Sequence, residues 1–211
     1  MRIAVFGTGA AGQALGAAFA DRGHEVVLGT RDPAATRARD GWDRALPLAE
    51  YDDAAAGADL VVNAVNGQAA LEALASAAGR LDGLVLLDVA NPLDFSAGFP
   101  PTLTVKDTDS LAEQIQRAHP GARVVKALNT VANEVMVDPA AIGDGDTTIF
   151  LAGDDPAARE TVTELLEGLG WRDVIAFPEL SAARGLEMWL PLWVRLMQQL
   201  GTTAFNLKIV R

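Results

Sequence analysis

The sequence predicts an α/β fold: a doubly wound, mostly parallel sheet with a small helical appendage at the C-terminus. Short runs of β-branched and other apolar residues alternate with Ala-rich segments along the chain. Most of these runs are apolar at consecutive positions, which is typical of strands that helices cover on both faces. The regular alternation of strand and helix indicates right-handed crossover units, which join parallel strands.

Seven strands and five helices are expected from this pattern. We expect the strands at residues 2–6, 25–29, 60–65, 84–89, 123–128, 148–152 and 173–177. We expect the helices at residues 12–22, 68–78, 110–118, 156–168 and 182–200, with Pro191 kinking or breaking the last one. Residues 91–107 contain three prolines and predict a long loop. Residues 205–210 are compatible with a short edge strand or a dimer-contact tail.

Composition excludes several classes of function. The chain contains no cysteine, so disulfides, thiolate metal sites and thiol catalysis are excluded, and a reducing cytoplasm is the expected location. Only two histidines are present, and no cluster of ligands predicts a metal site. The net charge of −11 would repel nucleic acid and anionic lipid. The apolar stretch at 188–197 contains an arginine and is about half the length of a membrane span.

A glycine motif follows the first expected strand and precedes the first expected helix. Gly7, Gly9 and Gly12 give the spacing G-x-G-x-x-G, in which Gly7 allows a tight turn and Gly9 a close backbone approach to a pyrophosphate. Gly12 would let the helix pack closely on the strand, and the helix N-terminus would present free N–H groups to the phosphates. The motif predicts a dinucleotide-binding domain of the Rossmann type at residues 1–178, with a C-terminal helix and tail at 179–211 in the same compact unit.

The end of the second expected strand indicates which dinucleotide is bound. An NAD site usually has an acidic residue here, whereas this chain has Thr30 and Arg31, with Asp32 one position late. A hydroxyl and a guanidinium suit the 2′-phosphate of NADP, and Thr8, Arg37 and Arg39 could add to this site. The alternative is that Arg31 is a solvated surface charge.

Seven segments together resemble the family of F420-dependent NADP oxidoreductases and their relatives, which include the cytoplasmic domain of STEAP-type metalloreductases. The segments are GTGAAGQALG at 7–16, LGTRD at 28–32, LVVNAV at 60–65, LLDVANPL at 86–93, VVKALNT at 124–130, FLAGDD at 150–155 and RGLEMWLPLWVRLMQQLG at 184–201. Only the first is common to Rossmann proteins in general.

The resemblance implies a cytoplasmic homodimer that transfers hydride between NADP(H) and a deazaflavin (coenzyme F420) or a flavin-like acceptor. No protein acid or base would be required, because the cofactors carry the chemistry. By position, the resemblance assigns cofactor binding to the glycine loop (Gly7, Thr8, Gly9, Ala10, Ala11 and Gly12), to Thr30 and Arg31, and to Ala64, Val65, Asn91, Asn129 and Val131.

Two positions depart from the family patterns and leave the acceptor open. Archaeal members that use the deazaflavin tend to have His where Asn129 aligns, and the metalloreductases an aromatic residue where Glu134 aligns. The alternatives are an NADPH-dependent reductase of a small carbonyl, imine or ferric chelate, and a non-catalytic NADP sensor.

Three further sets of residues have two interpretations each. Asn91 begins either a functional turn or an ordinary loop. Asp88, inside an apolar strand, is expected to accept hydrogen bonds from loop N–H groups rather than act as a base. Trp189 and Trp193 share a helix face that forms either the core or a dimer seam, or one wall of the flavin-like pocket.

Overall fold

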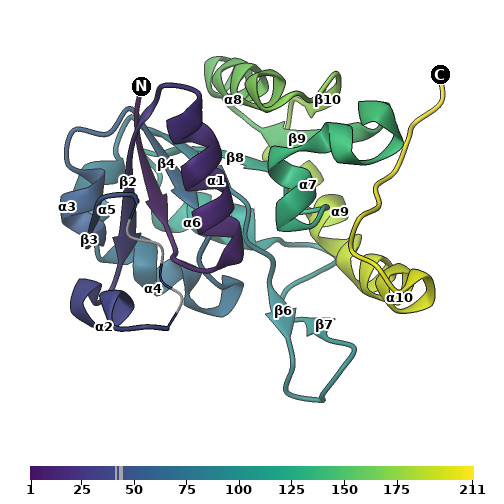
Figure 1. Cartoon of the computed structure of the whole chain (residues 1–211), viewed down its shortest axis with the longest axis horizontal. Coiled ribbons are helices and arrows are strands. Elements are labelled where there is room, and N and C mark those ends of the chain that lie inside the picture. Colours follow the sequence, from purple (N-terminus) through teal and green to yellow (C-terminus); the bar gives the residue numbers. More distant parts are fainter. Residues whose placement is uncertain (41, 43–44) are drawn as a thin grey trace.

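The computed structural model describes residues 1–40, 42 and 45–211. In this part of the chain, eight strands form one sheet in the order β10-β9-β8-β5-β4-β1-β2-β3, and β6 and β7 form a separate hairpin. Helices cover both faces of the sheet, and the hairpin and α10 project from one end (Figure 1). The predicted Rossmann-type α/β fold with a C-terminal helical appendage is confirmed.

The strands and helices have the following bounds. The strands are β1 Arg2–Phe6, β2 Glu25–Thr30, β3 Leu48–Glu50, β4 Leu60–Asn63, β5 Val85–Asp88, β6 Leu93–Asp94, β7 Thr102–Leu103, β8 Arg123–Ala127, β9 Thr148–Gly153 and β10 Asp173–Phe177. The α-helices are α1 Ala10–Asp21, α2 Pro33–Arg37, α3 Tyr51–Ala55, α4 Ala70–Ala75, α5 Ala78–Leu81, α6 Leu111–Ala118, α7 Asn133–Val137, α8 Pro156–Leu169, α9 Ala183–Met188 and α10 Leu190–Leu200. Short 3-10 turns lie at η1 Gly67–Ala69, η2 Pro139–Ala141, η3 Gly143–Gly145 and η4 Leu180–Ala182.

Six strands are parallel, and two run the other way. β3, β2, β1, β4, β5 and β8 lie side by side in the order that Rossmann sheets have, with the change of direction in strand order between β1 and β4. β9 pairs antiparallel with β8, and β10 pairs parallel with β9. The carboxyl ends of the first six strands therefore form one edge.

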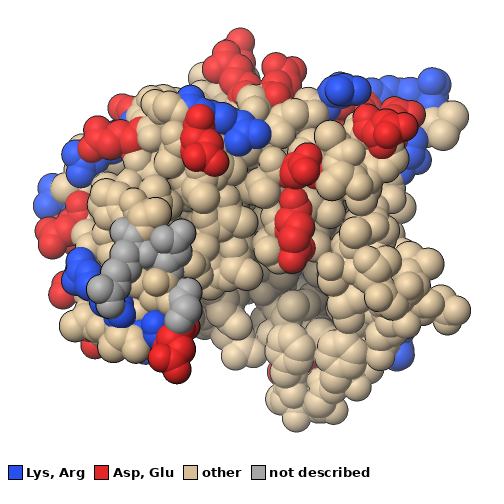
Figure 2. Space-filling model, viewed as in Figure 1, with Lys and Arg blue, Asp and Glu red and all other residues tan. Residues whose placement is uncertain are grey.

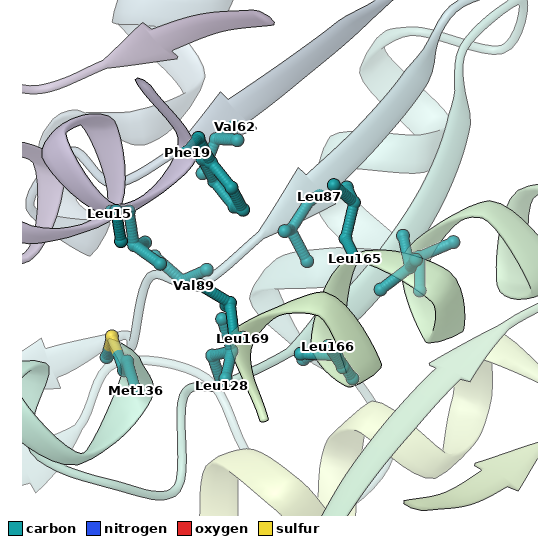
Figure 3. Close-up of a cluster of buried hydrophobic side chains, with 14 of the residues drawn as sticks. Leu15, Phe19, Val62, Leu87, Val89, Leu128, Met136, Leu165, Leu166 and Leu169 are labelled. Carbon is teal, nitrogen blue, oxygen red and sulfur yellow. The ribbon is translucent and has the colours of Figure 1, made fainter. Parts of the chain in front are cut away.

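Two apolar clusters hold the layers together. On one face of the sheet, α1, α7 and α8 pack against it through residues such as Phe19, Met136 and Leu166 (Figure 3). On the other face, α3 to α6 cover the alternate strand residues, among them Ala4 and Phe6 of β1. Burial of both faces explains why the strands have consecutive apolar residues.

Helix ends follow the expected signals. Ser110 accepts a hydrogen bond from the N–H of Glu113 and caps α6, and Asp155 caps α8 ahead of Pro156. Gly23 has a φ of +82° just after α1, a left-handed conformation that suits glycine at a helix end. No helix in the described ranges is long and apolar enough to cross a membrane.

The structure also corrects several expected bounds. The first helix begins at Ala10 rather than at residue 12, and the expected helix 68–78 is divided into η1, α4 and α5. The loop at 91–107 contains the β6–β7 hairpin. The expected break of the last helix is confirmed: it is interrupted at Trp189, two residues before Pro191, because a proline fits the first turn of a new helix but not a helix interior. Residues 205–210 form no strand, so the edge-strand interpretation was wrong.

Candidate functional site

The parallel strands bring most of the sequence-predicted site residues to one edge. Gly7 follows β1, Arg31 follows β2, Ala64 follows β4, Asn91 lies three residues after β5, and Asn129 lies two residues after β8. Because parallel strands end at a common edge, five segments that are far apart in the sequence converge there. In open α/β sheets this edge is where ligands bind.

The glycine turn is shaped by close backbone approaches. Gly7 has a φ of +111°, and a Cβ there would collide with the carbonyl oxygen of Ala64. A Cβ on Gly12 would collide with the carbonyl oxygen of Gly7, so the helix lies directly on the turn. Gly9, in contrast, has open space above it, since a Cβ there would meet nothing within 4 Å.

The N-terminus of α1 is available to an anion. Gly9 is its N-cap, and among the described residues no side-chain cap accepts a hydrogen bond from the first-turn amides. These amides have no intrahelical acceptor and carry the positive end of the helix dipole. Ala10 is exposed and Ala11 is half-buried at the start of this turn. The open space at Gly9 and the uncapped turn fit a dinucleotide pyrophosphate.

Two arginines from the segment after β2 are candidates for binding phosphate near this turn. Arg39 donates to the carbonyl oxygen (3.2 Å) and the hydroxyl oxygen (2.7 Å) of Thr8, and its guanidinium lies 5.3 Å from the ring centre of Trp42. Arg31 is exposed, and within residues 1–40, 42 and 45–211 no hydrogen bond or ion pair to its side chain is found. Thr30 is buried, and its hydroxyl shares a 3.0 Å hydrogen bond with that of Thr36.

A cleft of about 450 Å³ opens beside Arg31. Its lining residues come from the end of β2, the start of α3 and the helix after β4: Thr30, Arg31, Glu50, Tyr51, Asp52, Ala69, Glu72, Ala73 and Ser76. Burial raises the pKa of the Tyr51 phenol, although the nearby Arg31 acts to lower it. The cleft thus offers an aromatic ring and a guanidinium beside the expected 2′-phosphate position.

Asn91 and Asn129 form a reciprocal amide pair. The Nδ2 of Asn91 donates to the carbonyl oxygen of Asn129 (2.8 Å), and the Nδ2 of Asn129 donates to the Oδ1 of Asn91 (2.9 Å). The second hydrogen of Asn129 is donated to the carbonyl oxygen of Leu186 in α9 (3.0 Å). Both donors of Asn129 are therefore used, and its buried Oδ1 is an acceptor with no partner among the described residues.

The backbone just before Asn129 is strained. Leu128 is fully buried and has a φ of +62°, a left-handed conformation that costs a non-glycine residue roughly 1–2 kcal/mol. Such strain is typical of functional sites, where the surrounding structure enforces it. The next two residues differ in role: the buried hydroxyl of Thr130 has no described partner, while Val131 packs in the core. Val65 is half-buried at the end of β4.

Sequence reasoning missed a buried polar row behind this edge. Asn63, Asp88 and Lys126 occupy neighbouring register positions on β4, β5 and β8. Asp88 accepts from Asn63 Nδ2 (2.7 Å), Lys126 Nζ (2.7 Å) and the N–H of Ala90 (3.2 Å). The expected bond to a loop N–H is confirmed, but the ion pair with Lys126 was not foreseen. An apolar strand interrupted by a lysine was the signal that could have found it.

Two tryptophans of the C-terminal segment contact the loop after β8 and the tail of the chain. Trp189 donates its indole N–H to the carbonyl oxygen of Thr130 (3.2 Å), whereas Trp193 stacks on Phe205 at 5.3 Å. Trp189 thus contacts the β8 edge, and Trp193 holds the tail. Figure 2 shows a hollow between the N-terminal half and the lobe formed by the hairpin and α10.

The fold and the glycine turn define a dinucleotide-binding protein of the Rossmann class. Comparison with known proteins narrows this class. Residues 2–92 match the family described as NADP oxidoreductase, coenzyme F420-dependent. The chain is 32% identical, over 93% of its own length and 89% of the other protein, to the F420-dependent NADP reductase of Methanothermobacter thermautotrophicus.

Two further similarities agree. A solved structure from Arthrobacter sp. FB24, provisionally described as an F420-dependent NADP reductase, is 51% identical with a TM-score of 0.98 and full coverage of both chains. The metalloreductase STEAP3 of Rattus norvegicus is 26% identical over 91% of this chain and 38% of that protein. The chain belongs to the family of coenzyme F420-dependent NADP oxidoreductases, and its class of enzyme is the NADP-dependent oxidoreductases.

Proposed function

We propose that this protein transfers hydride between NADP(H) and coenzyme F420. The observation that carries the proposal is the similarity to a named F420-dependent NADP reductase over 93% of the chain, which includes the C-terminal segment that contacts the β8 edge. When bound, the nicotinamide of NADP(H) gives or accepts the hydride. The task of the chain is to bind and orient the two rings.

The phosphate groups of the dinucleotide would be held by the N-terminal part of the site. The backbone of Gly7, Thr8, Gly9, Ala10, Ala11 and Gly12 would hold the pyrophosphate at the N-terminus of α1. Arg31 would bind the 2′-phosphate together with Thr30. Arg39, which already contacts Thr8, would add positive charge where an acidic protein otherwise repels the ligand.

The nicotinamide end would be held by backbone and amide groups, with no protein acid or base. Ala64 and Val65 would line the ribose path, and Asn91, Asn129 and Val131 would border the zone of hydride transfer. Both N–H groups of Asn129 are used within the chain and its Oδ1 is buried, so Asn129 would act by fixing Asn91 and the loop after β8 beside the nicotinamide. The apolar surroundings would exclude water from the transferred hydride.

A single panel of acceptors tests the proposal. NADPH oxidation is followed at 340 nm with the purified protein and, in turn, coenzyme F420, FMN, FAD, a ferric chelate and a set of carbonyl and imine compounds. We expect turnover with F420 to exceed turnover with every other acceptor. Turnover restricted to carbonyls, or tight NADPH binding without any oxidation, would overturn it.

We further propose that the protein acts as a homodimer. Five exposed apolar side chains lie on the hairpin and the C-terminal helices: Phe95, Phe99, Met188, Leu192 and Leu200. Figure 2 shows few charged side chains over this lobe. Two copies with a net charge of −11 each would repel one another, so a face with few charges is where they can meet.

The mass in solution tests the dimer. Light scattering should give twice the chain mass of 22.1 kDa for the wild type. Leu192→Glu should give single chains, whereas Leu71→Glu, which changes an exposed leucine of α4, should leave the dimer intact. A wild-type protein with the mass of one chain, 22.1 kDa, would contradict the proposal. The division into a dinucleotide-binding domain at residues 1–178 and a C-terminal helix and tail at 179–211 in the same compact unit stays a proposal, as does a cytoplasmic location.

A further inference from the structure

A buried cation lies directly behind the candidate site, with two carboxylates bound to it. Lys126 of β8 is fully buried, and its Nζ lies 2.7 Å from Asp88 Oδ2 and 2.9 Å from Glu187 Oε1. The same ammonium also donates to the carbonyl oxygen of Ala90. Burial acts to lower the pKa of Lys126, but the two carboxylates outweigh it and raise that pKa, so the ammonium stays charged.

The second carboxylate is compensated by a helix end. Glu187 of α9 accepts hydrogen bonds from the N–H groups of Leu111 (2.8 Å) and Ala112 (3.2 Å), at the start of α6. These amides carry the positive end of the helix dipole. The group (Lys126, Asp88 and Glu187, called the ion triad below) has one positive and two negative charges, and the helix end offsets part of the excess negative charge, although burial still raises the pKa of Glu187.

Stability alone does not explain such a group. Removing three charges from water is costly, and well-packed apolar side chains often stabilise a core as well or better. What the ion triad does provide is a fixed position for four segments that are far apart in the sequence: the turn after β5, the end of β8, the start of α6, and α9.

The contacts of the ion triad are linked, along the chain or through one hydrogen bond, to Asn91 and Asn129. Ala90, whose carbonyl oxygen Lys126 binds, precedes Asn91. Glu187 follows Leu186, whose carbonyl oxygen accepts from Asn129. Lys126 itself lies three residues before Asn129, and the strained Leu128 lies between them. A small shift of Ala90, Glu187 or Lys126 would therefore move Asn91 or Asn129.

We propose that Lys126 and Glu187 are positioning residues, which hold the Asn91–Asn129 pair in the geometry that hydride transfer requires. This inference rests on the proposed function. The phosphate-binding residues lie in the turn between β1 and α1, in the first turn of α1 and at the end of β2, and none of them contacts the ion triad. Loss of Glu187 should therefore impair the hydride-transfer step and leave the dinucleotide bound.

The test compares Glu187→Gln with Glu113→Gln. The control removes the Glu113–Arg184 ion pair (2.5 Å), which also joins α6 to α9 but does not touch Lys126. We expect Glu187→Gln to lower kcat with F420 about tenfold or more, to enlarge the isotope effect with 4-deuterated NADPH, and to change the Kd of NADPH far less than kcat, because the phosphate contacts remain. Glu113→Gln should alter none of the three. A Glu187→Gln protein with normal kcat would overturn the proposal.

Hydrogen exchange provides a readout that needs no acceptor. In Glu187→Gln, exchange should accelerate at residues 89–92 and 128–131, and in Glu113→Gln it should not. If the wild type does not reduce F420, the proposed function is wrong. If hydrogen exchange in Glu187→Gln is unchanged, the positioning role is wrong, whatever the result for F420. If Glu187→Gln does not fold, Glu187→Asp is measured instead, because it keeps the charge but shortens the side chain. The same results for kcat, the isotope effect and hydrogen exchange then support or overturn the proposal.

Discussion

Arg31→Ala should weaken the binding of NADPH but not that of NADH. Arg31 is exposed beside the cleft at the end of β2, and its truncation removes no hydrogen bond or ion pair with any described residue. If the guanidinium binds the 2′-phosphate, NADPH loses a charge-assisted hydrogen bond. NADH has no group at that position and loses nothing.

The size of the effect follows from the exposure of the site. Hydrogen bonds to charged groups contribute about 1.5–3 kcal/mol. Solvent screening at an exposed arginine, and the positive charge of Arg39 that remains at Thr8, favour the lower end of that range. About 1.5 kcal/mol corresponds to roughly a tenfold rise in the Kd of NADPH.

Calorimetric titration measures both affinities on the same preparation. Arg37→Ala is the matched control: the sequence left Arg37 open as an addition to the 2′-phosphate site, but its guanidinium donates to the carbonyl oxygen of Leu48. Only Arg31→Ala should weaken NADPH selectively. An equal loss of NADPH and NADH affinity, or none for either, would refute the assignment of the 2′-phosphate to Arg31.

Two other predictions concern the glycine turn and acid stability. Gly9→Ala should keep the thermal midpoint of unfolding but lose NADPH affinity, because its new methyl enters open space that the pyrophosphate needs. Gly12→Ala should lower both the midpoint and the affinity, because its methyl meets the carbonyl oxygen of Gly7. Equal midpoints of the two variants in differential scanning fluorimetry would contradict this contrast. Hydrogen bonding to Arg117 lowers the pKa of Asp109 from 3.8 to about 2. This carboxylate thus stabilises the fold above about pH 4 and ceases to do so as the pH falls towards 2, so Asp109→Asn should show a smaller loss of stability across that range by circular dichroism.

The sheet could be predicted from the sequence because its strands are buried on both faces. All seven expected strands are present, with ends shifted by no more than two residues. β3 was missed because three residues are too few for a periodic pattern, and α7 because it is a single short helix after the β8 edge. The hairpin was missed because its two strands have only two residues each.

The candidate site was predictable where its signal is local. The glycine spacing and the Thr30–Arg31 pair can be recognised within a few residues, and the strand ends locate Asn91 and Asn129. The ion triad could not be found in this way, since Glu187 meets Lys126 from 61 positions further along the chain. Only the tertiary fold brings α9 to the end of β8.

The reversal of the last two strands determines how far the ligand crevice extends. Because β9 and β10 run opposite to β8, their starting ends lie at the edge where the other strands finish. That corner is filled by the chain terminus: Lys208 and Arg211 bind Asp173, and Thr148 donates its N–H to Leu207. A long dinucleotide thus has six strands to lie across, and the seventh and eighth act as an end wall. Under the proposed function, an acceptor would enter from the side of the hairpin and α10, and the C-terminal residues would then control which molecules reach the nicotinamide.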